Sequence, residues 1–88
     1  MLHTLLVEDN VALRDALKTG LEATGEVCVV GEVASGEGAV EHCLAEPPDV
    51  VLMDVALAGE MNGVQAAVAI RREVRQQILD RHLRLAPP

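Results

Sequence analysis

Residues 48–54, PDVVLMD, decide the fold, because a short apolar run stands there between a proline and a closing acid. Four consecutive apolar residues predict a strand of a parallel sheet that is covered on both faces. The acid that follows, Asp54, then lies at the carboxyl end of this strand. A second expected strand, residues 2–7, is followed in the same way by Glu8 and Asp9. Each of the two strands is therefore expected to end in carboxylates.

Helical and extended patterns alternate along the rest of the chain. The spacing of apolar residues predicts helices that begin after Asp9 or Asn10, after Ser35 and at Gly63, and Gly25 is expected to stop the first of them. Valine-rich residues 27–33 predict a strand between the first two helices. This alternation is typical of an α/β domain, in which right-handed crossovers join parallel strands.

The expected strand order is 2-1-3, with helices flanking the sheet. Ligands bind such sheets at the carboxyl ends of the strands, where the strand order reverses. Glu8, Asp9 and Asp54 would meet there. Taken singly, the first two acids are explained as favourable charges at a helix N-terminus, and the third as a turn residue. Together they indicate a cation site, because close carboxylates repel one another and oxygen ligands suit Mg²⁺.

The composition limits the classes of function. The chain has 88 residues, a formal net charge of −7 and no aromatic residue, which argues against binding to nucleic acids or to anionic membranes. It is expected to form a single domain, without a signal peptide or a membrane span. Its cysteines, Cys28 and Cys43, lack metal-binding spacing and fit small buried residues in a reducing cytoplasm.

Three motifs resemble the receiver domain of two-component response regulators. They are LLVEDN at residues 5–10, PDVVLMD at 48–54 and MNGV at 61–64, and the resemblance covers roughly residues 3–75. It implies a flavodoxin-like fold, with Asp54 as the phosphoacceptor and Mg²⁺ as the cofactor. The implied metal ligands are Asp9 directly, Glu8 mainly through water, Asp54, and the backbone carbonyl of Ala56.

The chain also departs from the family pattern. A complete receiver has five βα units, whereas three are recognised here, so we expect a truncated domain over residues 1–88, receiver-like to residue 75 and with a divergent helical tail over 76–88. The Ser or Thr that ends the fourth strand of a receiver and the Lys that ends the fifth are absent. The only lysine, Lys18, falls on the first expected helix.

The resemblance implies a module that accepts a phosphoryl group from a histidine kinase or a phosphotransfer protein. Beyond Mg²⁺-dependent self-phosphorylation, no enzyme activity is expected. An alternative is a degenerate receiver that is not phosphorylated and acts in protein interaction or dimerisation. A third is a remnant without an independent role. In each case the open edge of the third strand, or the last helix, is expected to drive self-association.

Overall fold

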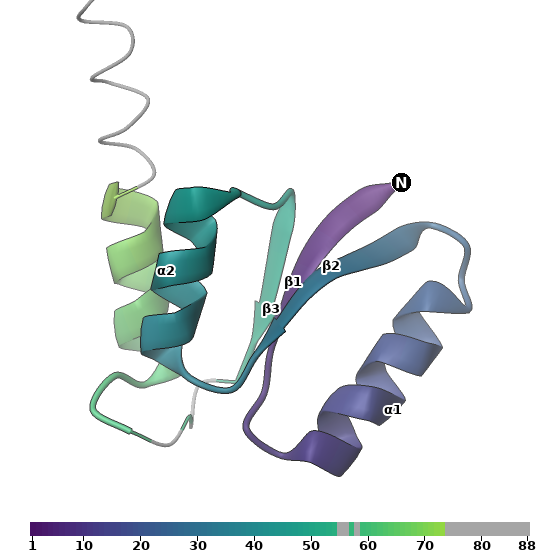
Figure 1. The fold of residues 1–88 in the computed structure, drawn as a ribbon, viewed down its shortest axis with the longest axis horizontal. Coiled ribbons are helices and arrows are strands. Elements are labelled where there is room, and N and C mark those ends of the chain that lie inside the picture. The colour runs from purple at the N-terminus through teal and green to yellow at the C-terminus, as the bar shows by residue number, and fades with distance from the viewer. Residues whose placement is uncertain (55–56, 58, 74–88) are drawn as a thin grey trace, which may run out of the picture.

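The computed structural model describes residues 1–54, 57 and 59–73. Strands and helices alternate in the order expected from the sequence (Figure 1). They are β1 (Leu2–Val7), α1 (Val11–Glu22), β2 (Val27–Val33), α2 (Gly36–Ala45) and β3 (Val50–Met53). A further helical segment follows at residues 63–73. The expected tail over residues 76–88 lies outside the described residues.

The three described strands form one parallel sheet in the order β2-β1-β3. This order confirms the prediction. Val7 at the end of β1 lies opposite Met53 at the end of β3. The next residue of each strand, Glu8 or Asp54, therefore leaves the sheet at the same edge.

β2 carries one irregularity. Thr4 of β1 lies opposite Val29, but the next residue, Leu5, lies opposite Gly31, so that Val30 is an extra residue in β2. Such a bulge bends the strand and increases its twist. A Cβ atom at Gly31 would overlap the imidazole ring of His42 on α2. The absence of a side chain at this position therefore lets β2 approach α2 closely.

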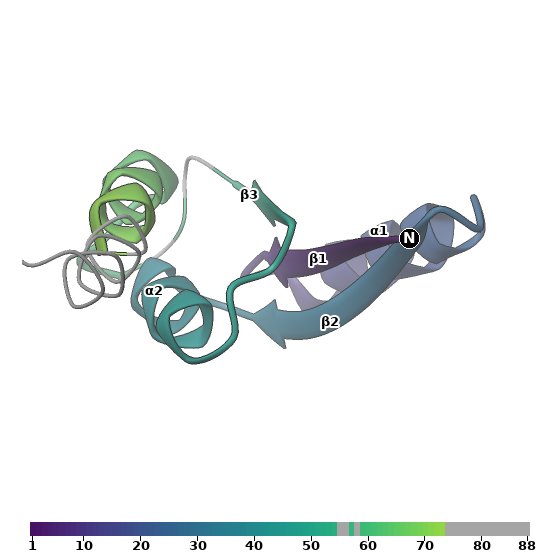
Figure 2. The same cartoon turned by 90° about the horizontal axis from the view of Figure 1, so that it is seen from above.

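Helices cover both faces of the sheet. α1 lies on one side, and α2 lies with residues 63–73 on the other (Figures 1 and 2). The core lies on the α2 side of the sheet, between α2 and the strands. Its buried members are Leu5, Val7, Ala39, Cys43 and Leu57, and the partly buried Val33, Val51, Met53 and Ile70 pack against them.

Polar side chains fix where the helices begin. Asn10 and Ser35 are the N-caps of α1 and α2, and each side chain accepts a hydrogen bond of 3.0 Å from the backbone N–H three residues later. Asn62 and Gln65 exchange reciprocal bonds of 2.9 and 3.0 Å at the start of the last helical segment. These contacts satisfy backbone donors that a helix leaves unpaired at its first turn.

The segment 63–73 has apolar residues at helical spacing, which predict a buried stripe that includes Val64, Ala67, Val68 and Ile70. Val64 and Val68 are exposed, whereas Gly63 and Ala66 are buried. The reason is a close helix contact: a Cβ atom added at Gly36 on α2 would lie 3.1 Å from the Cβ of Ala66. Small residues face α2 because larger side chains would hold the two helices apart.

The face of β3 that lies on the α1 side of the sheet is more open than its apolar run predicts. Val50 and Leu52 are each 40% exposed, although a strand covered on both faces was expected. Among the described strands β3 pairs with β1 alone, so its other edge is unpaired. α1, on the same face, packs mainly against β2 and has no fully buried residue. Coverage of this face therefore falls away toward β3.

Candidate functional site

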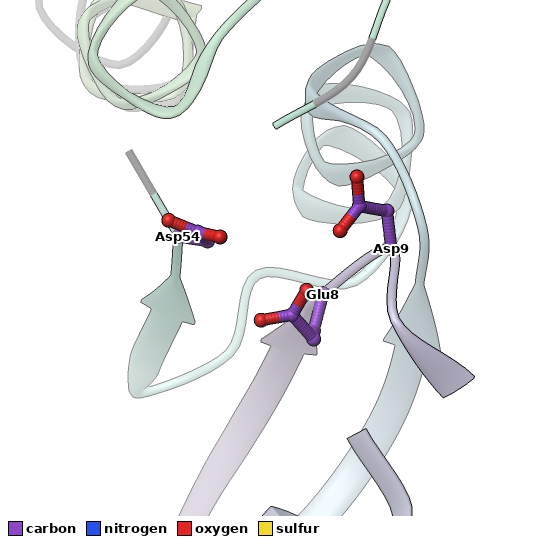
Figure 3. Close-up of side chains that lie close together, drawn as sticks. All are labelled: Glu8, Asp9 and Asp54. Atoms are coloured by element: carbon purple, nitrogen blue, oxygen red, sulfur yellow. The ribbon is translucent and has the colours of Figure 1, made fainter. Parts of the chain in front are cut away.

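Three carboxylates converge at the carboxyl ends of β1 and β3 (Figure 3). One oxygen each of Glu8, Asp9 and Asp54 lies within 4.8 Å of the other two. The structure thus brings together the three acidic residues selected from the sequence. The fourth residue selected for the metal site, Ala56, lies outside the described residues.

The three acids differ in exposure. Glu8 is only 5% exposed, Asp54 is half-buried and Asp9 is exposed. Burial of a charged group is costly unless the group is paired. One oxygen of Glu8 accepts a hydrogen bond of 3.1 Å from the backbone N–H of Asn10. Solvent reaches the site from the side of Asp9, and Glu8 forms its floor.

The backbone of Glu8 is held from both sides. Its N–H donates to the carbonyl of Val33 at the end of β2, at 3.0 Å. Its own carbonyl accepts a hydrogen bond of 2.9 Å from Nη1 of Arg14 on α1. Sequence reasoning missed Arg14. The signal in the sequence was helical spacing: Arg14 stands three residues before Leu17 and seven before Leu21. This spacing places the arginine on the face of α1 that packs against the sheet.

The donor set fits Mg²⁺. Ligand oxygens of an octahedral Mg²⁺ ion lie about 3.0 Å apart when they are neighbours and about 4.2 Å apart when they are opposite, because each Mg–O bond is about 2.1 Å long. Oxygens within 4.8 Å of one another are therefore close to the required spacing, and a water molecule can complete the contact to the buried carboxylate of Glu8. Three carboxylates also supply the negative charge that a hard divalent cation requires.

An open cavity of about 210 Å³ adjoins the acids on the α1 side of the sheet. Glu8 and Asp54 contribute its polar wall. Its apolar lining comes from β1, α1 and β3, namely Leu6, Val7, Leu17, Leu52 and Met53. A larger cavity of about 440 Å³ includes His3 and Pro48 and lies at the opposite end of the strands, away from the acids. The smaller cavity is therefore the one that belongs to the candidate site.

Comparisons with known proteins agree with this arrangement. Residues 4–79 match the response regulator receiver domain family. The chain is 36% identical over 74 residues to the transcriptional regulatory protein LiaR of Bacillus subtilis, covering 84% of this chain and 35% of LiaR. It is 40% identical over 72 residues to the response regulator UvrY of Escherichia coli, covering 82% of this chain and 33% of UvrY. The chain thus spans about a third of the length of these relatives.

Solved structures show the same likeness. The signal receiver domain of the response regulator NarL from Mycobacterium tuberculosis superposes with a TM-score of 0.75 at 35% identity, over 81% of this chain and 56% of that one. The response regulator domain of CheB from Thermotoga maritima gives a TM-score of 0.78 at 30% identity, over 83% and 54% of the two chains. With its parallel sheet and its acids at the ends of β1 and β3, the chain belongs to the response regulator receiver domain family.

Proposed function

We propose that this chain is a phosphoacceptor module of two-component signalling. Asp54 would receive the phosphoryl group from a phosphohistidine of a histidine kinase or a phosphotransfer protein. The observation that carries the proposal is the convergence of Glu8, Asp9 and Asp54 at one sheet edge in a member of the receiver family. All three carboxylates would serve the metal, and Asp54 would in addition be the nucleophile.

In the proposed reaction a carboxylate oxygen of Asp54 attacks the phosphorus atom. The phosphorus–nitrogen bond to the histidine breaks, its electron pair returns to the imidazole ring, and an acyl phosphate forms on Asp54. The half-buried position of this side chain at the strand end leaves it accessible to a donor. Bound Mg²⁺ would offset the negative charge of the phosphoryl group as the group approaches the acids.

The metal would be held by side chains already in place. Asp9 and Asp54 would coordinate Mg²⁺ directly, and Glu8 would act mainly through a bound water molecule. The backbone carbonyl of Ala56, outside the described residues, would add a further ligand. Glu8 is suited to the indirect role because it is the most buried of the three acids and already accepts a hydrogen bond from Asn10.

The proposed module works as a substrate of its kinase and not as an independent enzyme. At most it would promote its own phosphorylation from a small donor in the presence of Mg²⁺. Among the described residues no helix is both long and apolar enough to cross a bilayer. We place the module in the cytoplasm, without direct contact with nucleic acid, in keeping with its net charge of −7.

The test is phosphorylation by acetyl phosphate in the presence of Mg²⁺, followed by intact-protein mass spectrometry. We expect one phosphoryl group on the unsubstituted chain and none on Asp54→Asn. Asp49→Asn is the matched control, because Asp49 lies before the first residue of β3 and contacts His3 instead of the acidic group. Full labelling of Asp54→Asn, or full labelling in excess chelator, would disprove the proposal.

A second candidate function is protein interaction without phosphorylation. It is favoured by the open edge of β3 in the described sheet and by the exposure of Val50 and Leu52. Self-association through this edge would cover these side chains, and self-association through the last helix is the other route. If this is the whole function, the chain associates equally with and without Mg²⁺ and acetyl phosphate, and Asp54 stays unmodified.

The proposed module occupies residues 1–75, and the tail over residues 76–88 would be a separate helical extension. Lys18 is the only lysine of the chain, and it pairs with Glu32 at 3.5 Å. Lys18 is therefore not assigned the role of the lysine that contacts the phosphoryl group in complete receivers.

A further inference from the structure

Residues 8–10 connect β1 to α1 and are called the acidic turn, because they include Glu8 and Asp9. Arg14 reaches from the first turns of α1 to the backbone of this turn. Its Nη1 donates to the carbonyl oxygen of Glu8 at 2.9 Å, across six residues of chain. The side chain is only 19% exposed, so the guanidinium is largely withdrawn from water. A charged hydrogen bond in such a setting is stronger than a neutral one. This bond therefore restrains the residue that begins the turn between β1 and α1.

Arg14 also forms an ion pair, without a hydrogen bond, to β2. Its Nε lies 3.8 Å from Oε1 of Glu32, and the other oxygen of that carboxylate lies 3.5 Å from Nζ of Lys18. Glu32 in turn sits opposite Leu6 in the sheet register. The arginine thus links three elements at one point: α1, the end of β2 and the end of β1.

We propose that Arg14 is a positioning residue for the metal ligands Glu8 and Asp9. This inference rests on the proposed function, because it assigns a task to Arg14 at the same site. The direction of the Glu8 carbonyl sets the path of the backbone into Asp9, and hence the directions in which the two carboxylates point. The hydrogen bond from Asn10 to the Glu8 side chain closes the same turn. Removal of the guanidinium would release the carbonyl oxygen of Glu8 from its hydrogen bond.

A pure charge effect and a purely structural role of Arg14 would each give a different result. If Arg14 acted through its charge alone, its removal would strengthen metal binding, because a cation beside a cation site opposes the ion. If Arg14 served the fold alone, its removal would lower the melting temperature but leave the affinity of the folded chain unchanged. Positioning predicts weaker binding by a folded protein. Stronger binding therefore indicates a charge effect, unchanged binding a purely structural role, and weaker binding a positioning role.

The experiment measures Mg²⁺ affinity by isothermal titration calorimetry at a temperature where circular dichroism shows every variant folded. Arg14→Met keeps the aliphatic stem and removes the donors. We expect it to weaken Mg²⁺ binding about tenfold, the lower end of the effect of groups that orient metal ligands. Lys18→Met is the matched control, because it removes the other cation beside Glu32 but no contact to Glu8. We expect its affinity to change less than about twofold.

Glu32→Gln is the second variant, in case Arg14→Met does not fold. It leaves the guanidinium in place and weakens its anchor on β2, so we expect a smaller loss of affinity in the same direction. Unchanged or tighter binding by the folded Arg14→Met chain would overturn the inference. If Arg14→Met is unfolded, unchanged or tighter binding by Glu32→Gln would overturn it.

Amide hydrogen exchange without metal gives an independent measurement. The N–H of Asn10 is hydrogen-bonded to the side chain of Glu8, so its exchange rate reports the order of the turn. We expect faster exchange in Arg14→Met and no change in Lys18→Met. If the unsubstituted chain bound no Mg²⁺, the proposed metal site would be wrong, and the exchange rate would still decide whether Arg14 orders the turn. An unchanged rate at Asn10 in Arg14→Met would refute that role.

Discussion

The backbone N–H of Asp54 donates a hydrogen bond to the carbonyl oxygen of Val7, 3.4 Å away. This bond continues the β1–β3 ladder one residue beyond the end of β3. Since Glu8 directly follows Val7, the distance between the proposed nucleophile and the acidic turn is set by strand pairing. The acids therefore converge through the sheet itself.

The three acids should repel one another when no metal is bound. Two unit charges about 5 Å apart oppose each other by about 1 kcal/mol in watery surroundings. We expect Asp9→Asn to raise the melting temperature of the chain in excess chelator and to reduce the further stabilisation by Mg²⁺, both measured by calorimetry. Asp15→Asn, an exposed position on α1, is the charge-matched control and should change neither quantity. A lower melting temperature of Asp9→Asn in chelator would contradict this account.

The contact of α2 with the segment after β3 should not tolerate a methyl group at Gly36. The added Cβ would lie 2.7 Å from the backbone carbonyl oxygen of Met61, which cannot move as a flexible side chain does. We expect Gly36→Ala to lower the free energy of unfolding by about 1–3 kcal/mol in urea denaturation. Gly20→Ala adds the same methyl group to α1, where it meets open space. This substitution should raise the free energy of unfolding by up to about 1 kcal/mol. Equal effects of the two substitutions would exclude a steric cause.

The open side of β3 should promote self-association. We expect Leu52→Lys to raise the concentration at which the chain associates, because a charge on this strand opposes pairing with a second copy. Val68→Lys tests the alternative route, since Val68 is exposed on the segment 63–73. Size-exclusion chromatography with light scattering compares the two variants. A monomer at every concentration of the unsubstituted chain would rule out both routes.

Stability should decline at alkaline pH through Cys43. Burial raises the pKa of the Cys43 thiol above its ordinary value of 9.0. Folding therefore favours the neutral thiol, and this contribution is complete below pH 9.0 and is lost as the pH rises through the higher pKa of the folded state. Urea denaturation from neutral to alkaline pH should show a steeper decline for the unsubstituted chain than for Cys43→Ala. Parallel curves would show that the thiol does not contribute.

The meeting of the acids could be predicted from the sequence. Apolar runs followed by acids place Glu8 and Asp54 after strands, and parallel pairing brings the carboxyl ends of neighbouring strands to one edge. The residues at which the helices end could not be predicted as closely. Gly25, which has a positive φ of 76°, was expected to stop the first helix, but α1 ends at Glu22. A turn follows, in which the N–H groups of Thr24 and Gly25 bond back to carbonyls of the last helical residues.

Contacts that depend on packing could not be predicted in the same way. Arg14 reaches Glu8 because α1 packs on the sheet against β2 and β1, a placement that no motif specifies. The exposure of Val64 and Val68 has a similar cause. Apolar periodicity favours a buried stripe that includes both valines, but the close approach of Gly36 on α2 places Ala66 on the buried side instead.

The alignment of Val7 with Met53 limits how the chain can vary in length. One residue inserted within β3 would move Asp54 along the sheet by about 3.3 Å and turn its side chain to the opposite face. One residue inserted between Gly59 and Asn62 would leave the ladder unchanged, because it falls after the last strand pair. Homologous chains with the same chemistry should therefore differ in the length of that connection while keeping the length of β3 constant.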